Sequence, residues 1–485
     1  MEKSLVLERY PQYRMDIGIE VHVQLNTNSK IFCSCSNALT QDPNENICPI
    51  CAGHPGVLPV LNEQVVEYAI KAGLGTHCAI SEISEFDRKH YFYPDLPKGY
   101  QVTQNYFPIC TSGYVMIRLE DGTEKKIRIN RIHIEEDAGK NMHSELTGES
   151  YVDLNRAGTP LLEIVSEPDI ENAAEAKAYL KALRLIMQYL GVSDCNMEEG
   201  SFRADTNLSV RKKDSATLGT RCELKNINSF KFISDAIEYE TERQIQALEA
   251  GQRIRQETRL WDSKNRRSIP MRSKEDLADY RYCTDPDLSL INVTNTKLQE
   301  VTQLMPELPY HKFHRYMNQW GLSAYEADVI TSDIEFTKYI EAAMAVYPQK
   351  SVVNWFLRDV LGFANEHKIE VATCLMTPEK LAKLVRMLDE SVINNTAAKE
   401  VFELVAQNGQ DPEIIVEQKG LKQIGSADEL EKIVQSVVAQ NPALIEQYKA
   451  GKQNVVGFLI GSCMKATGGK GNPKMLQEIL KKYLQ

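Results

Sequence analysis

A carboxylate and an imidazole alternate with apolar residues early in the chain, in the segment Ile17-Gly-Ile-Glu-Val-His-Val-Gln-Leu25. Because successive side chains of an extended strand point to opposite faces, Glu20 and His22 would lie side by side on one face. Carboxylate oxygen and neutral imidazole nitrogen are both ligands for divalent cations. The pattern therefore predicts a metal-binding strand, although a polar sheet face turned towards water would show the same alternation.

Two later segments place further charges at the centres of predicted strands. The residues from Phe202 to Val210 alternate so that Arg203 and Asp205 share one face. Glu163 stands alone in the apolar run Leu-Leu-Glu-Ile-Val. A carboxylate flanked by aliphatic residues is costly to bury unless a metal, an ion pair or a shifted pKa compensates. Glu163 and Asp205 are therefore expected to join the face that carries His22.

A further strand-like segment, residues 127–140, ends in three consecutive acids followed by Ala-Gly-Lys. Its register is ambiguous, so either Glu135 or Glu136 would join the face of His22. Lys225 would project from another strand together with Arg221 and Glu223. These segments predict an α+β fold class, in which an antiparallel sheet packs one face on helices and lines the other with acids and bases. Binding a nucleotide phosphate through a metal requires this mixture of charges.

Four of the eleven cysteines are grouped as Cys33-Ser-Cys35 and Cys48-Pro-Ile-Cys51. Two thiolate pairs on neighbouring loops suit a tetrahedral zinc ion, whereas free thiols or a redox pair are the alternatives in a reducing compartment. Four thiolates fill the coordination of zinc and leave no open position for water or substrate. We therefore expect a structural zinc ion that fixes an irregular loop, and not a catalytic centre.

Composition sets outer limits on the function. The chain has 485 residues, of which 42% are hydrophobic and 25% charged, as expected for an ordinary protein of two to four domains. The N-terminal residues lack a signal-peptide core, and no apolar stretch approaches the length of a membrane span, so a cytoplasmic location is expected. A net charge of −11 argues against a chain coated in basic patches, so any contact with nucleic acid must be local.

The chain changes character near residue 295. Before it, short alternating runs are separated by Pro, Gly and Asn, with helical stretches near residues 62–75, 173–190 and 231–250. After it, helices dominate, and one of them is expected to have Thr377 as its N-cap and Pro378 at its first position. The sequence thus predicts an α+β body followed by an all-helical C-terminal region.

The last 35 residues carry a local excess of positive charge. Six lysines oppose only Glu478, which gives a net charge of +5 in this segment. Lys465, Lys470 and Lys474 lie among glycines that would let the backbone approach an anionic polymer closely. This arrangement suits a contact with RNA that is not sequence-specific, but a flexible, well-solvated tail is an equal alternative.

Five long motifs, in this order along the chain, resemble the B subunits of bacterial aspartyl/glutamyl-tRNA(Asn/Gln) amidotransferases; they are Ile17-Gly-Ile-Glu-Val-His22, Phe86-Asp-Arg-Lys-His-Tyr-Phe-Tyr-Pro-Asp95, Glu135-Glu-Asp-Ala-Gly-Lys140, residues 153–169 and Met197-Glu-Glu-Gly-Ser-Phe-Arg203. The resemblance implies a catalytic cradle related to the glutamine synthetase fold at residues 1–300, a helical domain at 301–415 and a tail domain at 416–485 that contacts tRNA. It also implies that ATP phosphorylates the side-chain carboxylate of Glu on tRNA(Gln) or Asp on tRNA(Asn), after which ammonia displaces phosphate.

The same resemblance implies roles for individual residues. A catalytic and metal-binding set for Mg²⁺ or Mn²⁺ would comprise Glu20, His22, Glu136, Glu163 and Asp205, which decides the open register in favour of Glu136. Substrate binding would involve Lys89, Tyr91, Arg203 and Lys225, and tRNA binding would involve Lys465, Lys470 and Lys474. Some family members lack the cysteine quartet, so zinc is not expected to take part in the chemistry.

Two features that would be expected for this reaction are missing from the sequence. No Gly-rich phosphate loop occurs, so the sheet is expected to hold ATP through a metal ion. No glutaminase signature occurs either, so ammonia is expected from an amidase A subunit, which a small C subunit would join to this chain in a heterotrimer. Two alternatives remain open from the residues: a stand-alone ATP-dependent carboxylate–amine ligase for a small acid, and a non-enzymatic RNA-binding protein with a structural zinc ion.

Overall fold

The computed structural model describes residues 5–144, 147–273, 280–424, 427–449, 452 and 454–484. The chain divides into two compact units, residues 1–311 and residues 312–485. The first unit contains all the described strands and the second is helical, so the predicted α+β class with a helical C-terminal region is confirmed. The division into three domains and the relationship to the glutamine synthetase fold stay predictions.

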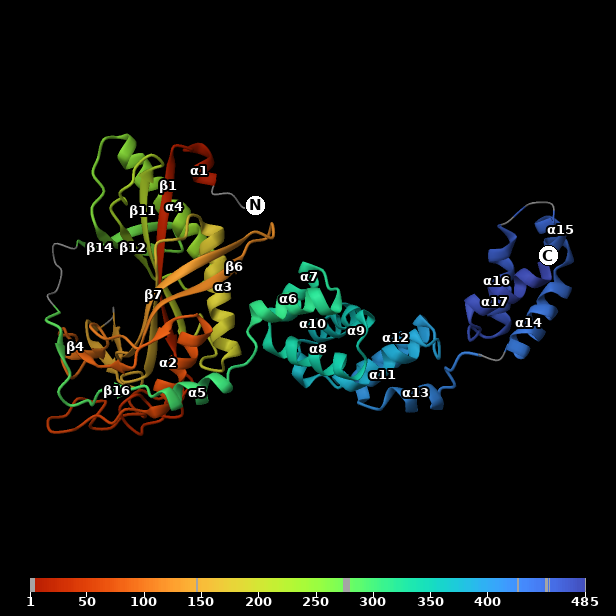
Figure 1. Cartoon of the computed structure of the whole chain (residues 1–485), viewed down its shortest axis with the longest axis horizontal. Helices are drawn as coiled ribbons and strands as arrows, with labels where there is room; N and C mark the ends of the chain where they lie inside the picture. Colours follow the sequence, from red (N-terminus) through yellow and green to blue (C-terminus); the bar gives the residue numbers. More distant parts are fainter. Residues whose placement is uncertain are drawn as a thin grey trace. The chain divides into compact units, whose positions relative to one another are not determined.

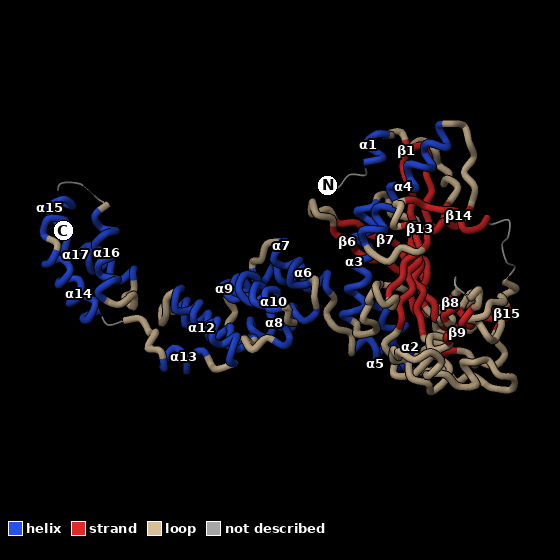
Figure 2. Tube along the Cα trace, turned by 180° about the vertical axis from the view of Figure 1, so that it is seen from behind, coloured by secondary structure: helices blue, strands red, loops and turns tan. Residues whose placement is uncertain are grey.

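A nine-stranded sheet forms the centre of the first unit (Figures 1 and 2). Its neighbours run antiparallel, except for one parallel pair, β12 and β13. In spatial order the strands are β14 (Arg267–Ser273), β13 (Glu257–Asp262), β12 (Cys222–Lys225), β11 (Phe202–Lys212), β1 (Tyr13–Gln24), β10 (Pro160–Ser166), β7 (Glu124–Glu136), β6 (Cys110–Arg118) and β2 (Ala79–Ile80).

Alternation along the central strand β1 gives the sheet one apolar and one polar face. Ile19, Val21 and Val23 are buried, whereas Glu20 and His22 keep partial access to solvent. The apolar side chains share one hydrophobic core with helices α2 (Glu63–Gly75), α3 (Ala173–Tyr189) and α4 (Phe230–Glu249). These helices confirm the three helical stretches predicted before residue 295. Each begins after an Asn or Ser whose side chain accepts a hydrogen bond from the first turn.

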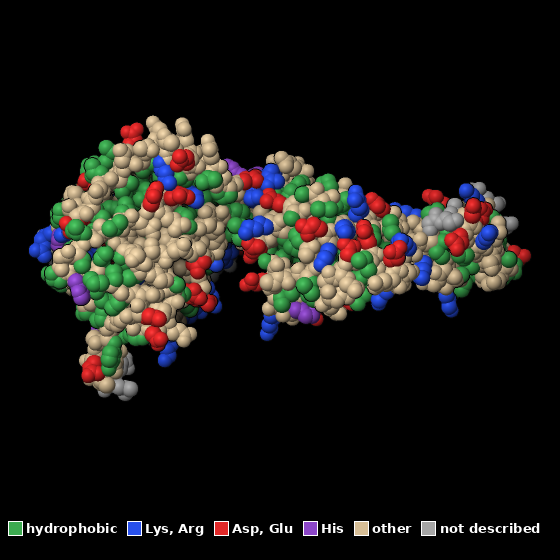
Figure 3. Space-filling view, turned by 90° about the horizontal axis from the view of Figure 1, so that it is seen from below, with side chains coloured by type: hydrophobic (Ala, Val, Ile, Leu, Met, Phe, Trp, Pro, Cys, Tyr) green, Lys and Arg blue, Asp and Glu red, His purple; other side chains and the backbone are tan. Residues whose placement is uncertain are grey.

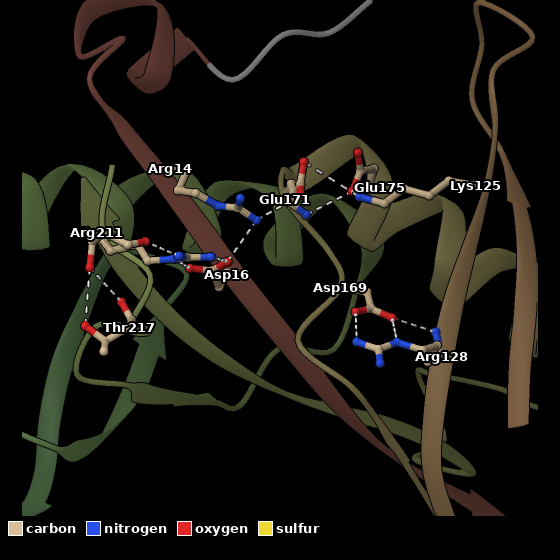
Figure 4. Close-up of polar contacts among 10 residues, drawn as sticks. Arg14, Asp16, Lys125, Arg128, Asp169, Glu171, Glu175, Arg211 and Thr217 are labelled. Carbon is tan, nitrogen blue, oxygen red and sulfur yellow. Dashed lines mark hydrogen bonds and ion pairs between the residues drawn. The ribbon is translucent and has the colours of Figure 1, made fainter. Parts of the chain in front are cut away.

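Ion pairs fix the first residues of β1 against their surroundings (Figure 4). The buried carboxylate of Asp16 lies 2.7 Å from the Arg211 guanidinium on β11 and 3.1 Å from that of Arg14. Arg14 also contacts Glu171, just before α3, at 2.9 Å. Because a buried carboxylate is tolerated only when it is paired, these contacts favour one placement of β1 between β11 and the segment that leads into α3.

Three smaller sheets and two further helices complete the first unit. The strand β4 carries Lys89, and Tyr91 follows directly after it. The smaller sheets are β15 (Cys283–Thr284) with β4 (Asp87–His90) and β5 (Tyr100–Thr103), β16 (Ile291–Asn292) with β3 (Ile83–Ser84), and β8 (Lys140–His143) with β9 (Ser150–Asp153); the helices are α1 (Leu5–Arg9) and α5 (Asn295–Gln303).

The second unit has two hydrophobic clusters, one formed by the elements α6 to α13 and one by α14 to α17. Thr377 caps α11 and Pro378 occupies its first position, as predicted. None of the helices in the described ranges has the length and apolar character needed to cross a membrane. The elements are α6 (Pro309–Trp320), α7 (Ala324–Thr331), α8 (Ile334–Val346), α9 (Lys350–Trp355), the π-helix η2 (Phe356–Val360), α10 (Leu361–His367), the 3₁₀-helix η3 (Val371–Thr373), α11 (Pro378–Asp389), α12 (Asn395–Asn408), α13 (Pro412–Gln418), α14 (Ala427–Gln440), α15 (Pro442–Lys449), α16 (Val455–Ala466) and α17 (Pro473–Leu484).

Candidate metal and substrate site

Three neighbouring strands bring an imidazole and two carboxylates together on the polar face of the large sheet. His22 on β1 pairs across the ladder with Glu163 on β10. The Nε2 atom of His22 lies 3.6 Å from Glu163 and 3.3 Å from Glu135, which comes from β7. One ligand atom from each of these three residues lies within 4.8 Å of the other two. Two carboxylates and one imidazole form a donor set that suits Mg²⁺ or Mn²⁺, so the residues fit the predicted cation.

Glu136 does not belong to this group. One position beyond Glu135, it turns away from His22, accepts a hydrogen bond from the backbone N–H of Val102 at 2.9 Å and pairs with the ammonium of Lys98. The prediction that Glu136 shares the face of His22 is therefore wrong. The physical reason is the two-residue period of a strand, in which a shift of one position moves a side chain to the opposite face.

The charges of the three ligand residues support one another. Burial opposes ionisation of Glu135, but hydrogen bonds from His133 and His22 outweigh it and hold the pKa of Glu135 well below its ordinary value. Burial likewise opposes ionisation of Glu163, and the charge of His133 lowers the pKa of this carboxyl overall. In His22 burial lowers the pKa, but the hydrogen bond and charge of Glu135 raise it above its ordinary value. The site therefore presents two ionised carboxylates.

Lys225 binds a second group of acids further along the same face. Its ammonium lies 2.6 Å from Asp205 on β11 and 3.0 Å from Glu223 on β12. Glu20 pairs across the ladder with Asp205 and accepts a hydrogen bond from Asn207 at 2.9 Å. Burial, together with the charges of nearby carboxylates, raises the pKa of Glu20. Glu20 and Asp205 thus share the predicted face but surround a lysine instead of joining the group of His22.

The short strand β4 brings Lys89 near this face. Burial lowers the pKa of Lys89, but the charges of Glu135 and Glu163 help to raise it above its ordinary value, so the side chain is a cation. Its ammonium lies 4.9 Å from the centre of the Tyr280 ring, whose centre is 6.2 Å from that of Tyr91. Burial raises the pKa of Tyr91. Lys89 and Tyr91 therefore place a positive charge and an aromatic surface near the carboxylates of Glu135 and Glu163.

Arg203 faces His22 across the β1–β11 ladder. Its guanidinium lies 2.8 Å from Asp137, and Asp137 also lies 3.4 Å from Arg156. About 37% of the Arg203 side chain is exposed, so it can turn part of its hydrogen-bonding capacity towards a bound anion. A substrate role for Arg203 stays a prediction.

The four grouped cysteines meet in space. Their sulfur atoms all lie within 4.8 Å of one another, whereas sulfurs around a tetrahedral zinc ion are about 3.8 Å apart. A hydrogen bond from Cys33 and the nearby charge of Lys30 lower the pKa of Cys51 to about 4. Burial raises the pKa of Cys35 to about 11. The Cys51 thiolate therefore forms readily, whereas Cys35 needs a nearby cation to ionise, and a cluster of four sulfur atoms at this spacing fits zinc.

The three tail lysines surround one turn of the second unit. Lys465 lies in the last turn of α16, Lys470 in the following loop and Lys474 in the first turn of α17, and all three are exposed. Acidic and basic side chains are interspersed over the helical unit on the face drawn in Figure 3. Contact with RNA on an acidic protein has to be local, and the three exposed lysines around this turn offer such a surface.

Sequence reasoning gave no role to three residues of this face. Glu135 was one of two open alternatives, Glu223 was recognised only as a neighbour of Lys225, and His133 was not considered. The Nε2 atom of His133 lies 3.1 Å from Glu163 and 3.7 Å from Glu135. The alternation of His133 with Glu135 along β7 was a signal that the two side chains share a face, but it did not show which strand lies beside them.

Comparison with known protein families gives two matches along the chain. The family model of the GatB/GatE catalytic domain matches residues 15–299, and that of the GatB domain matches residues 338–484. The chain belongs to the GatB family. It is 50% identical over 471 residues to the B subunit of the aspartyl/glutamyl-tRNA(Asn/Gln) amidotransferase of Persephonella marina, with 97% of this chain and 99% of the relative covered.

Two further GatB relatives bear the same description. Identity to the protein of Thermoanaerobacter pseudethanolicus is 49%, with 98% of this chain and 99% of the relative covered. For the protein of Geotalea daltonii it is 50%, with 98% and 100% covered. The catalytic-domain match spans His22, Glu135, Glu163 and the four grouped cysteines, and the second GatB match spans the tail lysines.

Proposed function

We propose that this chain is the B subunit of a tRNA-dependent amidotransferase, a ligase that converts Glu-tRNA(Gln), Asp-tRNA(Asn) or both into the amidated forms. Membership of the GatB family supports the tRNA-dependent reaction and does not favour a stand-alone ligase or a non-enzymatic RNA-binding protein. The observation that carries the chemistry is the convergence of His22, Glu135 and Glu163 on one sheet face beside Lys89.

The reaction has two steps. An oxygen of the substrate's side-chain carboxylate attacks the γ-phosphorus of ATP, the bond to the bridging β–γ oxygen breaks, and ADP leaves. Ammonia then attacks the carbonyl carbon of the acyl phosphate, phosphate leaves with the C–O bonding electrons, and the nitrogen loses a proton. Activation is necessary because a free carboxylate resists attack by ammonia, and the first step depends on positioning and charge neutralisation.

The residues divide this work between them. His22, Glu135 and Glu163 would hold a divalent cation, which when bound neutralises charge on the phosphoryl oxygens. The ammonium group of Lys89 would add positive charge beside the carboxylates, so that two anions can approach each other. Lys225, which pairs with Asp205 and Glu223, would contact the substrate from the neighbouring strand. Tyr91 and Arg203 would orient the side-chain carboxylate of the amino acid and the end of the tRNA that carries it. The cysteine cluster would hold a structural zinc ion away from these steps.

Ammonia must come from elsewhere, because the chain has no glutaminase signature. We infer that an amidase A subunit supplies it and that a small C subunit completes a heterotrimer. The exposed lysines around the turn between α16 and α17 would contact the tRNA backbone, since Lys465, Lys470 and Lys474 are exposed together. The place of action would be the cytoplasm.

The test uses the chain with its amidase partner, ATP, glutamine and each misacylated tRNA. ADP is measured, and the amino acid released from the RNA is identified. We expect Glu163→Gln and His22→Ala to abolish ADP formation, while the exposed Glu120→Gln serves as a control that retains it. Normal ADP formation by Glu163→Gln would refute the cation site. Activity that needs no tRNA, and that survives deletion of residues 416–485, would refute the tRNA-dependent reaction.

A further inference from the structure

His133 is a buried histidine behind the cation site that the proposed mechanism does not use. Its side chain is only 4% exposed, against 21% for His22 and 16% for Glu163. A cation and a nucleotide would therefore reach the site from the side of His22 and Glu163. We propose that His133 is a positioning residue, which holds the two carboxylates in place for the cation from the opposite side. This inference rests on the proposed cation site.

The contacts of His133 carry the argument. Its Nε2 atom lies 3.1 Å from Oε2 of Glu163 and 3.7 Å from Oε2 of Glu135. His22 contacts the other oxygen of Glu135, Oε1, at 3.3 Å. Glu135 is thus held at both oxygens, by one imidazole on each side. Because a carboxylate only accepts, the proton between His133 and Glu163 must lie on Nε2 of the imidazole.

The ladder places His133 directly beside Glu163, and the grouping of ligand atoms separates His133 from His22. His133 on β7 pairs with Glu163 on β10, which pairs in turn with His22 on β1. The two histidines are therefore separated by a whole strand, which puts their Cα atoms about 9.6 Å apart. The group whose ligand atoms approach one another in the described residues comprises His22, Glu135 and Glu163. Residues that orient metal-binding side chains in this way affect metal affinity strongly.

A purely structural role for His133 makes a different prediction. The side chain is surrounded by core strands, and its Nδ1 atom has no hydrogen-bond partner in the described part of the chain. If His133 only filled space, an apolar side chain of similar size would serve as well or better, because it would remove the unpaired Nδ1 atom. If the Nε2–H group holds the carboxylates in place, cation binding will survive only when the new side chain places a hydrogen-bond donor at that position.

The test compares three substitutions in the full chain, with Mn²⁺ alone as the probe. His133→Gln can place an amide N–H near the position of Nε2, His133→Asn is polar but too short to reach it, and His133→Leu is apolar. Mn²⁺ binding is measured from the loss of the free-ion EPR signal, and thermal unfolding is measured in parallel. The exposed His143→Gln serves as the matched control.

We expect His133→Gln to bind Mn²⁺ within about 3-fold of the unmodified chain, and His133→Asn and His133→Leu to bind it about 10–100-fold more weakly. Normal affinity in a folded His133→Leu or His133→Asn would overturn the inference. An equal loss of Mn²⁺ affinity in His133→Gln and His133→Asn would also overturn the inference. Failure of the proposed cation site is distinguishable, because the unmodified chain and His143→Gln would then bind no Mn²⁺ either. Should the Leu variant not fold, the Gln and Asn pair still decides the matter.

Discussion

Removal of the buried charge of Glu240 should destabilise the first unit strongly. Glu240 lies on α4 with no exposed surface. Its carboxylate accepts hydrogen bonds from Arg243 at 2.6 and 2.8 Å and from Gln244 at 2.9 Å, and lies 3.4 Å from Arg259 on β13. Glu240→Gln keeps the size of the side chain but removes the negative charge that both guanidinium groups share.

The expected loss of stability depends on which carboxylates remain near the two arginines. Arg259 is only 9% exposed, and after the substitution Glu257 is the carboxylate left near both Arg243 and Arg259. Removal of one partner from a buried ion pair costs about 3–5 kcal/mol. Because Glu257 remains and 27% of the Arg243 side chain is exposed to water, we expect the lower end of that range, about 3 kcal/mol.

The assay uses the fluorescence of Trp261, which is buried on β13 two positions from Arg259. The other two tryptophans, Trp320 and Trp355, lie in the second unit and are replaced by Phe, so that urea unfolding reports on the first unit. A loss of less than 1 kcal/mol in the free energy of unfolding at pH 7 would refute the reasoning.

The pH dependence provides an independent check of the same reasoning. Burial raises the pKa of Glu240, but hydrogen bonds and charge from Arg243 outweigh it, and the pKa in the folded state lies below the ordinary value of 4.5. The contribution of this group is therefore fully present above pH 4.5 and is lost as the pH falls through the folded-state pKa. The difference between the original chain and Glu240→Gln should shrink below pH 4.5. A difference that stays constant down to pH 3 would mean that charge is not its cause.

Three further predictions concern the sites. Cys51→Ser should lower the zinc content measured by mass spectrometry well below one ion per chain, and the exposed Cys283→Ser should not; equal zinc in both variants would exclude the cysteine cluster as the site. Glu20→Gln should raise the melting temperature at pH 7, because burial raises the pKa of Glu20 and an ionised Glu20 therefore destabilises the fold. The contribution of Glu20 to stability is full below pH 4.5 and is lost as the pH rises through the folded-state pKa, so a gain that persists at pH 4 would contradict this cause. Lys470→Ala should weaken tRNA binding and reduce the slope of log affinity against log salt by about 1, and an unchanged slope would remove Lys470 from the RNA contact.

Local patterns in the sequence predicted most of the elements that carry the site. The alternation that begins at Ile17, the lone Glu163 and the run from Phe202 to Val210 correspond to β1, β10 and β11, which are neighbours in the sheet. These predictions succeed because a side chain's face is set by the two-residue period of its own strand. The grouping of the cysteines was equally local, since all four lie within 19 consecutive residues, 33–51.

Contacts between strands were beyond such patterns. That Lys225 would bind Asp205 and Glu223, or that Lys98 would bind Glu136, depends on which strands are neighbours and in which register. A single sequence contains no direct record of pairing, because many registers bury the same apolar face. Roles that depend on a partner in another strand, such as that of His133, therefore could not be assigned before the ladder was known.

The choice between Glu135 and Glu136 shows how one local irregularity decides a site. Ile127 and Ile129 of β7 are buried, and so are Ile132 and Ile134, which leaves a spacing of three between Ile129 and Ile132. If the alternation set by Ile127 and Ile129 continued unbroken, residue 136 would lie on the polar face. The alternation set by Ile132 and Ile134 puts residue 135 there instead. The ladder to β10 shifts register between Val165 and Ser166, opposite this point of β7. Such a bulge moves every later side chain to the other face. The extra residue in β7 therefore turns Glu135 towards His22 and Glu136 towards Lys98.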